Sequence, residues 1–232
     1  MDTAKQFSNP GLASDPVVSM IIRWIPDGEN TDAFLRSLLA QSYSNIEILF
    51  ILERSCERSI LTKFINIAKE EQVQVSILEV DTFHGNARIF EGFGGDYFCF
   101  PEISGILDEA FVTSLVWRLE NEKSLDGVRC DGVYVDERDL DFVIDNLIDP
   151  PSEVQSSQLM SLVTRKSPIN ISLWMMRKSS ILDIMITHLS LDRLTWNWQF
   201  AVPFSYGKNI GFVNHRLIKL VHYNDTSIQK RT

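Results

Sequence analysis

The apolar residues of this chain fall into continuous runs and into stripes at helical spacing. The run Val17–Ile22 is interrupted only by Ser19 and is rich in branched side chains, which is typical of a strand covered on both faces. A loop follows, and Thr31 is placed to cap a helix. The stripe of that predicted helix consists of Phe34, Leu35, Leu38 and Leu39.

The same alternation continues along the chain. Residues 46–52 form a second predicted strand, and 73–80 a third. Between them lies a second amphipathic stripe made of Ile60, Leu61, Phe64, Ile65 and Ala68. Strand, helix, strand, helix, strand at this spacing predicts an α/β fold with a parallel sheet, whose crossover helices cover its two faces.

The rest of the chain is less regular. Predicted strands cover residues 96–100, 128–135, 169–176, 210–213 and 217–221, and 179–188 reads as a short helix. A further helical stripe consists of Leu107, Phe111, Leu115 and Leu119. No repeat or low-complexity linker divides the chain, so we expect one compact domain.

Charge and composition narrow the function. The chain has 232 residues, 22 basic against 31 acidic, and a formal charge of −9; a protein that binds the nucleic-acid backbone needs the opposite sign. Any anionic ligand must then be held by a metal or a few placed arginines. The apolar runs are far shorter than the ~20 residues of a membrane helix, although contact with a membrane surface stays open. Three widely spaced cysteines and the lack of a basic-then-apolar leader favour the cytoplasm.

Four strings carry a resemblance to a known family. Pro16–Ile22 is similar to the pattern P-x-V-S-V-I-I-P, and Leu38–Ile48 to S-L-L-x-Q-T-Y-x-N-x-E-I. Gly95–Phe100 is similar to G-E-Y-I-x-F, and His222–Ile228 more loosely to Y-R-x-H-x-x-S-I. These strings resemble the inverting family-2 glycosyltransferases of the GT-A fold.

The resemblance implies a Rossmann-like sandwich with a mostly parallel central sheet and helices on both faces. It divides the chain into an N-terminal extension (1–15) and one GT-A-like domain (16–232), with a nucleotide-binding half (16–135) and an acceptor-side half (136–232). It also implies transfer of a sugar from a nucleotide-diphosphate donor to a glycan or lipid-linked hydroxyl acceptor. In that family an Asp-x-Asp pair holds a divalent cation against the diphosphate, and a carboxylate takes the acceptor's proton.

The chain departs from the family at the metal motif. The Asp-x-Asp position reads Glu102-Ile103-Ser104, so Glu102 is the implied ligand for Mn²⁺ or Mg²⁺ and Ser104 is a weak neutral partner. A competing interpretation makes Glu102 an acid at the start of the following helix, favoured by the helix dipole.

Other implied donor contacts are also altered. At the position of the family's nucleoside-binding carboxylate, this chain has Glu53, followed by Arg54. Arg23 and Trp24 lie in the first loop, which in the family packs on the base of the nucleotide. The resemblance also implies that Arg88 donates two hydrogen bonds to a diphosphate. For Glu53, a solvated carboxylate at a strand end is an equally good interpretation.

The position of the family's catalytic base is also altered. The family's E-D-W string reads Leu194-Thr195-Trp196, which leaves Asp192 as the nearest candidate base. Two hypotheses therefore remain: a divergent glycosyltransferase, or a catalytically inactive GT-A-like module that binds or scaffolds in glycan assembly. The acidic run between Asp131 and Asp141 either lines an acceptor pocket or forms a solvated face.

Overall fold

A computed structural model describes residues 15–25, 30–80, 93–146, 170–182, 204 and 208–222. Its helices and strands follow the predicted alternation closely through the first half of the chain. In chain order they are β1 (Val18–Arg23), α1 (Thr31–Leu39), β2 (Ile46–Glu53), α2 (Ser59–Glu70), β3 (Gln74–Val80), β4 (Tyr97–Cys99), β5 (Gly105–Leu107), α3 (Phe111–Asn121), β6 (Gly127–Asp136), β7 (Asp139–Asn146), the 3-10 helix η3 (Ile171–Leu173), β8 (Trp174–Arg177) and β9 (Ile210–His222).

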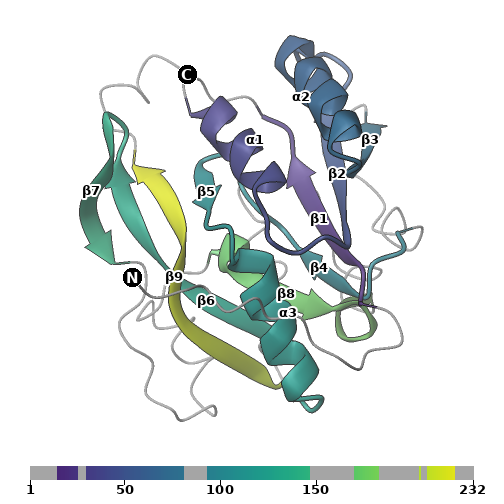
Figure 1. Ribbon diagram of the computed structural model, residues 1–232, viewed down its shortest axis with the longest axis vertical. Coiled ribbons are helices and arrows are strands. Elements are labelled where there is room, and N and C mark those ends of the chain that lie inside the picture. Colours follow the sequence, from purple (N-terminus) through teal and green to yellow (C-terminus); the bar gives the residue numbers. More distant parts are fainter. Residues whose placement is uncertain are drawn as a thin grey trace.

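The described strands form one mixed sheet (Figure 1). Its order is β3-β2-β1-β4-β8-β6-β9-β5, and β7 pairs with β6. β1 to β4 are mutually parallel, and β6 and β9 are parallel to each other. Because β8 is antiparallel to both β4 and β6, those two strands also run in the same direction. The sheet is therefore mostly parallel, with β5, β7 and β8 reversed.

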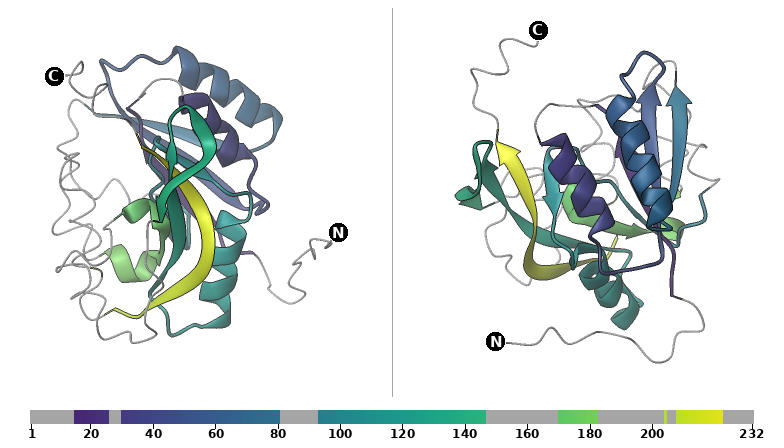
Figure 2. Two further views of the ribbon diagram at one scale, coloured as in Figure 1. Left: turned by 90° about the vertical axis from the view of Figure 1, so that its left-hand side faces the viewer. Right: turned by 45° about the horizontal axis from the view of Figure 1, so that its top comes forward.

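Helices lie on both sides of this sheet. α1, α2 and α3 lie on one side, while η3 and the helical residues 178–182 lie on the other (Figure 2, left). α1 buries Phe34, Leu35 and Leu38, as its stripe predicts. The prediction that Thr31 caps this helix is wrong, because Thr31 is its first residue and Asn30 occupies the cap position without a side-chain bond.

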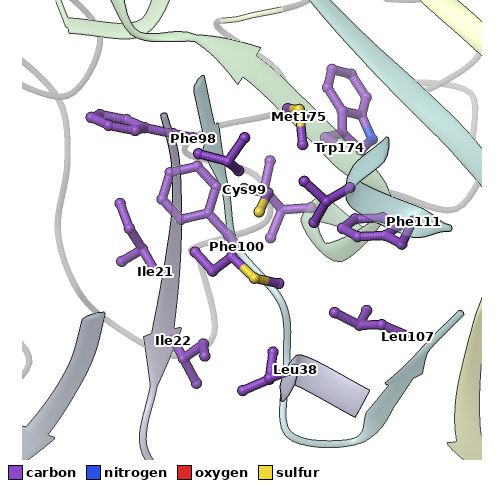
Figure 3. Close-up of a cluster of buried hydrophobic side chains, with 14 of the residues drawn as sticks. Ile21, Ile22, Leu38, Phe98, Cys99, Phe100, Leu107, Phe111, Trp174 and Met175 are labelled. Carbon is purple, nitrogen blue, oxygen red and sulfur yellow. The ribbon is translucent and has the colours of Figure 1, made fainter. Parts of the chain in front are cut away.

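The main core joins the two halves of the sheet. Side chains from β1, α1, β4, β5, α3 and β8 meet in one cluster (Figure 3). Phe98, Cys99 and Phe100 belong to this cluster and are at most 1% exposed. Cys99 packs here as a small buried side chain, and burial raises the pKa of its thiol.

The polar residues that follow α1 tie separate segments to one another. The Gln41 side chain donates from Nε2 to the carbonyl oxygens of Ser37 and Asp108, each at 2.9 Å, and accepts from the Val112 N–H at 3.1 Å. The Tyr43 hydroxyl donates to the Pro16 carbonyl at 2.6 Å. These contacts join the end of α1 to the start of α3 and to the segment before β1.

The second half of the chain differs more from expectation. Leu107 belongs to β5 rather than to a helix, and α3 begins at Phe111. The two predicted closing strands are one strand, β9, and β7 was not predicted at all. None of the described helices is long and apolar enough to cross a membrane.

Candidate nucleotide-sugar site

The carboxyl ends of the parallel strands meet at one edge of the sheet, towards which the arrowheads of β1 and β9 point in Figure 1. β1 lies between β2 and β4, and the chain builds β2 and β3 on one side of β1 before it places β4 on the other. Such a reversal of strand order opens a crevice outside the carboxyl ends, where ligands of α/β proteins bind. The edge between β1 and β4 is therefore the candidate site.

Arg23 ends β1 and Glu102 follows β4, the two neighbouring strands at this reversal. The last residues that pair β1 with β4 are Met20 and Cys99. Arg23 and Glu102 each lie three residues beyond them along parallel neighbours. Both side chains are half-buried. The fold thus brings a guanidinium and a carboxylate from distant parts of the sequence to adjacent strand ends.

Glu53 and Arg54 lie at the end of the next strand. Glu53 is the last residue of β2, pairs with Val80 of β3, and is half-buried. The exposed Arg54 donates its backbone N–H to the Val80 carbonyl at 3.2 Å, which fixes the start of the turn. A second backbone bond, from Cys56 N–H to the Glu53 carbonyl at 3.0 Å, closes that turn.

Trp24 occupies a different environment from the one expected of a nucleotide contact. Its indole is 0% exposed and packs edge-on against Phe50, with ring centroids 5.5 Å apart. The indole N–H donates to the Glu57 carbonyl at 3.1 Å. Because the ring presents no surface to a base, Trp24 anchors the loop after β1 to the loop after β2 instead of stacking on a nucleotide.

Glu102 faces the second half of the sheet. Tyr134 of β6 has its pKa raised by burial first, and then by the negative charges of Glu102 and Asp145. The Glu102 carbonyl accepts the Gly105 N–H at 2.8 Å, which turns the chain directly into β5. The interpretation of Glu102 as a helix-start acid is therefore wrong, because β5 separates it from α3.

The described residues are a poor fit to the divalent cation that the family resemblance implies. Mn²⁺ and Mg²⁺ are usually held by carboxylates, whereas the motif here offers Glu102 and the neutral Ser104. Within the described ranges, no group of three or more His, Cys, Asp or Glu side chains is arranged to hold a metal ion.

Two of the expected site residues, Arg88 and Asp192, lie outside the described residues. Sequence reasoning missed Tyr134, because it stands inside a strand in no recognised motif. Only the three-dimensional pairing of β6 with β9, and of β9 with β5, brings it towards Glu102.

Comparison with known proteins bears on the fold. No protein-family model matches the chain, and no curated protein matches it in sequence. Residues 1–349 of TarS from S. aureus share its structure with a TM-score of 0.65 and 12% identity, over 88% of this chain and 60% of that one. The same TarS fragment in complex with UDP-GlcNAc gives a TM-score of 0.61 at 10% identity, over 90% of this chain and 59% of that one.

A second similar protein comes from another organism. The mannosyltransferase PcManGT from Pyrobaculum calidifontis, in complex with GDP-Man and Mn²⁺, has a TM-score of 0.59 and 9% identity, over 90% of this chain and 57% of that one. The chain thus spans less than two thirds of the length of these neighbours. Together they define its class: the chain has the mixed α/β fold of GT-A glycosyltransferases, with a curled, mostly parallel sheet.

Proposed function

We propose that this chain transfers a sugar from a nucleotide-diphosphate donor to a hydroxyl group of a glycan or lipid-linked acceptor. The single observation behind the proposal is the edge at the strand-order reversal, where Arg23 and Glu53 end β1 and β2 and Glu102 follows β4, three adjacent parallel strands of a GT-A sheet. UDP-GlcNAc and GDP-Man in the similar structures support a donor of this chemical class.

In this proposal the chain's own cations bind the diphosphate. Arg23 ends β1 and Arg54 follows β2 at the same edge, and the family resemblance implies Arg88 as a third guanidinium for the diphosphate. A guanidinium fork matches two phosphate oxygens and keeps its charge at any physiological pH. Glu53 accepts a hydrogen bond from the nucleoside. Because the described residues fit a cation poorly, the arginines neutralise the diphosphate in this proposal.

The reaction follows as a single displacement. Asp192 removes the proton from the acceptor hydroxyl as its oxygen attacks the anomeric carbon. The bond from that carbon to the diphosphate breaks on the opposite face, so the configuration inverts. The products are the glycoside, the nucleoside diphosphate and protonated Asp192. The arginines stabilise the negative charge that grows on the leaving group.

Turnover of a panel of nucleotide-sugars tests this proposal. Release of nucleoside diphosphate is measured with Mn²⁺, with Mg²⁺ and with EDTA. Loss of a general base costs about 10²–10⁴ in rate, so Asp192→Asn should lose about that factor and keep its affinity for the donor. No turnover, combined with no binding of any nucleoside diphosphate, contradicts the proposal.

The second candidate is a GT-A-like module without catalysis. It is favoured by Ser104 and Thr195 standing where the family resemblance implies carboxylates, and by the burial of Trp24. This candidate predicts no turnover in the same panel, whether or not a nucleotide binds. The division at residues 135 and 136 and the cytoplasmic setting remain parts of the proposal in either case.

A further inference from the structure

Three consecutive large hydrophobic side chains are exposed on β7. Phe142 is 60% exposed, Val143 45% and Ile144 44%. In the described part of the chain, the other large hydrophobic side chains exposed to this degree are scattered singly over other elements. Contiguous apolar surface of this kind marks an interaction site more often than isolated residues do.

β7 is also at the margin of the sheet. Within the described residues it pairs with β6 alone, and Figure 1 shows the β6–β7 hairpin at the side of the molecule away from α2 and β3. Leu140 anchors the hairpin by packing with Val133, Val135 and Val221. An edge strand presents unpaired backbone groups, which form a template for another strand.

The charge of the hairpin restricts what can pair there. Residues 136–146 contain five acidic side chains and one basic one, Arg138. Lys219 of β9 compensates Asp141, with 2.9 Å between Nζ and Oδ1. Asp139 and Asp145 are exposed as well. A second copy of the chain would bring the same acidic strand against this one, and an anionic membrane would repel it.

We propose that β7 is a docking edge for an extended protein segment in which basic and apolar residues alternate. The sequence of β7 has the complementary character: acidic and apolar residues alternate in Asp139-Leu140-Asp141-Phe142, and Ile144-Asp145 follow before the strand ends at Asn146. A partner strand adds main-chain hydrogen bonds along the edge, covers Phe142 and Ile144 with its apolar side chains, and places its basic side chains near the aspartates. This docking edge goes beyond the proposed sugar transfer and does not depend on it.

A fluorescent peptide of alternating Lys and Val, titrated with the full chain, tests the proposal. The expected result is saturable binding that weakens by about tenfold or more on going from low to high salt. Phe142→Ser and Asp141→Asn should each weaken it by several-fold to about tenfold. Two control peptides, one of alternating Glu and Val and one with a central proline in the Lys–Val series, should not bind.

The matched control variant is Ile77→Ser. Ile77 is 41% exposed on β3, a strand at one end of the sheet order that pairs with neither β6 nor β7, and its replacement should leave the affinity within about twofold. Equal losses in Ile77→Ser and Phe142→Ser, or equal binding of the Glu–Val peptide, overturn the proposal. So does absence of peptide binding by a chain whose unfolding transition is intact. Self-association of the chain that disappears in Phe142→Ser would instead assign β7 to a second copy, and binding to anionic vesicles that disappears in that variant would assign it to a membrane.

Discussion

The hydroxyl of Ser19 donates a hydrogen bond to the carboxylate of Glu47, which joins the starts of β1 and β2. The same carboxylate oxygen accepts the backbone N–H of Gly95, just before β4, at 3.0 Å. Ser19, Glu47 and Gly95 each belong to a different string of the family resemblance. The three strings therefore meet at the amino ends of the strands, on the edge opposite the candidate site.

Replacing Glu47 tests whether this contact stabilises the fold. Glu47→Gln keeps the shape but removes the charge from a half-buried acceptor of two hydrogen bonds, and bonds to charged groups contribute about 1.5–3 kcal/mol each. We expect the free energy of unfolding in urea to fall by about 1–3 kcal/mol. Glu70→Gln, at an exposed position at the end of α2, is the control and should change it by no more than about 0.5 kcal/mol.

Gly95→Ala should be destabilising for a steric reason. A Cβ atom there would lie 2.1 Å from the Ser19 Oγ and 2.9 Å from the Ser19 backbone nitrogen. Since the second contact is with backbone, Ser19→Ala should not rescue Gly95→Ala. Thermal unfolding of the two single variants and the double variant measures this. Recovery of the wild-type Tm in the double variant would show that the hydroxyl alone limits the space.

Gln41→Ala should weaken the connection between the end of α1 and the start of α3 and so lower the stability of the fold. The variant loses three hydrogen bonds: the carbonyl of the exposed Asp108 is left to water, and the N–H of the buried Val112 loses its side-chain acceptor. At about 0.5–1.5 kcal/mol for each bond, we expect a loss of about 1–3 kcal/mol in urea unfolding. Gln74→Ala, on the exposed surface of β3, is the matched control. An equal effect of the two replacements would contradict the structural role of Gln41.

The first half of the fold was predictable because the local spacing of apolar residues is enough to identify each helix and strand. The run before Arg23 and the stripe of Phe34, Leu35 and Leu38 bury the surfaces their spacing predicts. β5 and β7 were not predictable in the same way. β5 has three residues, too few for a period, and β7 combines exposed hydrophobic residues with aspartates, which reads as a solvated acidic run.

The candidate site was predictable in part. Arg23, Glu53 and Glu102 were identified by resemblance, and the sheet places all three at carboxyl ends of parallel strands. The burial of Trp24 was not predictable, because a Trp next to a strand end has the same sequence context whether its ring packs inward or outward. The partner of its indole, the Glu57 carbonyl, comes from a different loop.

Substitutions at the end of β2 should separate nucleoside binding from phosphate binding. If Arg54 binds the diphosphate, Arg54→Gln lowers the affinity for the nucleoside diphosphate by several-fold to about tenfold and leaves the affinity for the free nucleoside unchanged. If Glu53 holds the nucleoside, Glu53→Gln lowers the affinity for both ligands by a similar factor. Arg36→Gln, on the exposed side of α1, should affect neither. Fluorescence or calorimetric titration of each variant with both ligands gives the comparison.

Calorimetric titration of the wild-type chain with UDP, GDP, ADP and CDP, in Mn²⁺ and again in EDTA, measures whether the edge between β1 and β4 is a nucleotide site. We predict that at least one of them binds with a Kd below about 1 mM, equivalent to about −4 kcal/mol. If the arginines neutralise the diphosphate, this affinity should persist in EDTA. Strict dependence on Mn²⁺ would instead show that a cation on Glu102 neutralises it. Absence of binding by all four nucleotides in both conditions would contradict a nucleotide-sugar site in this chain.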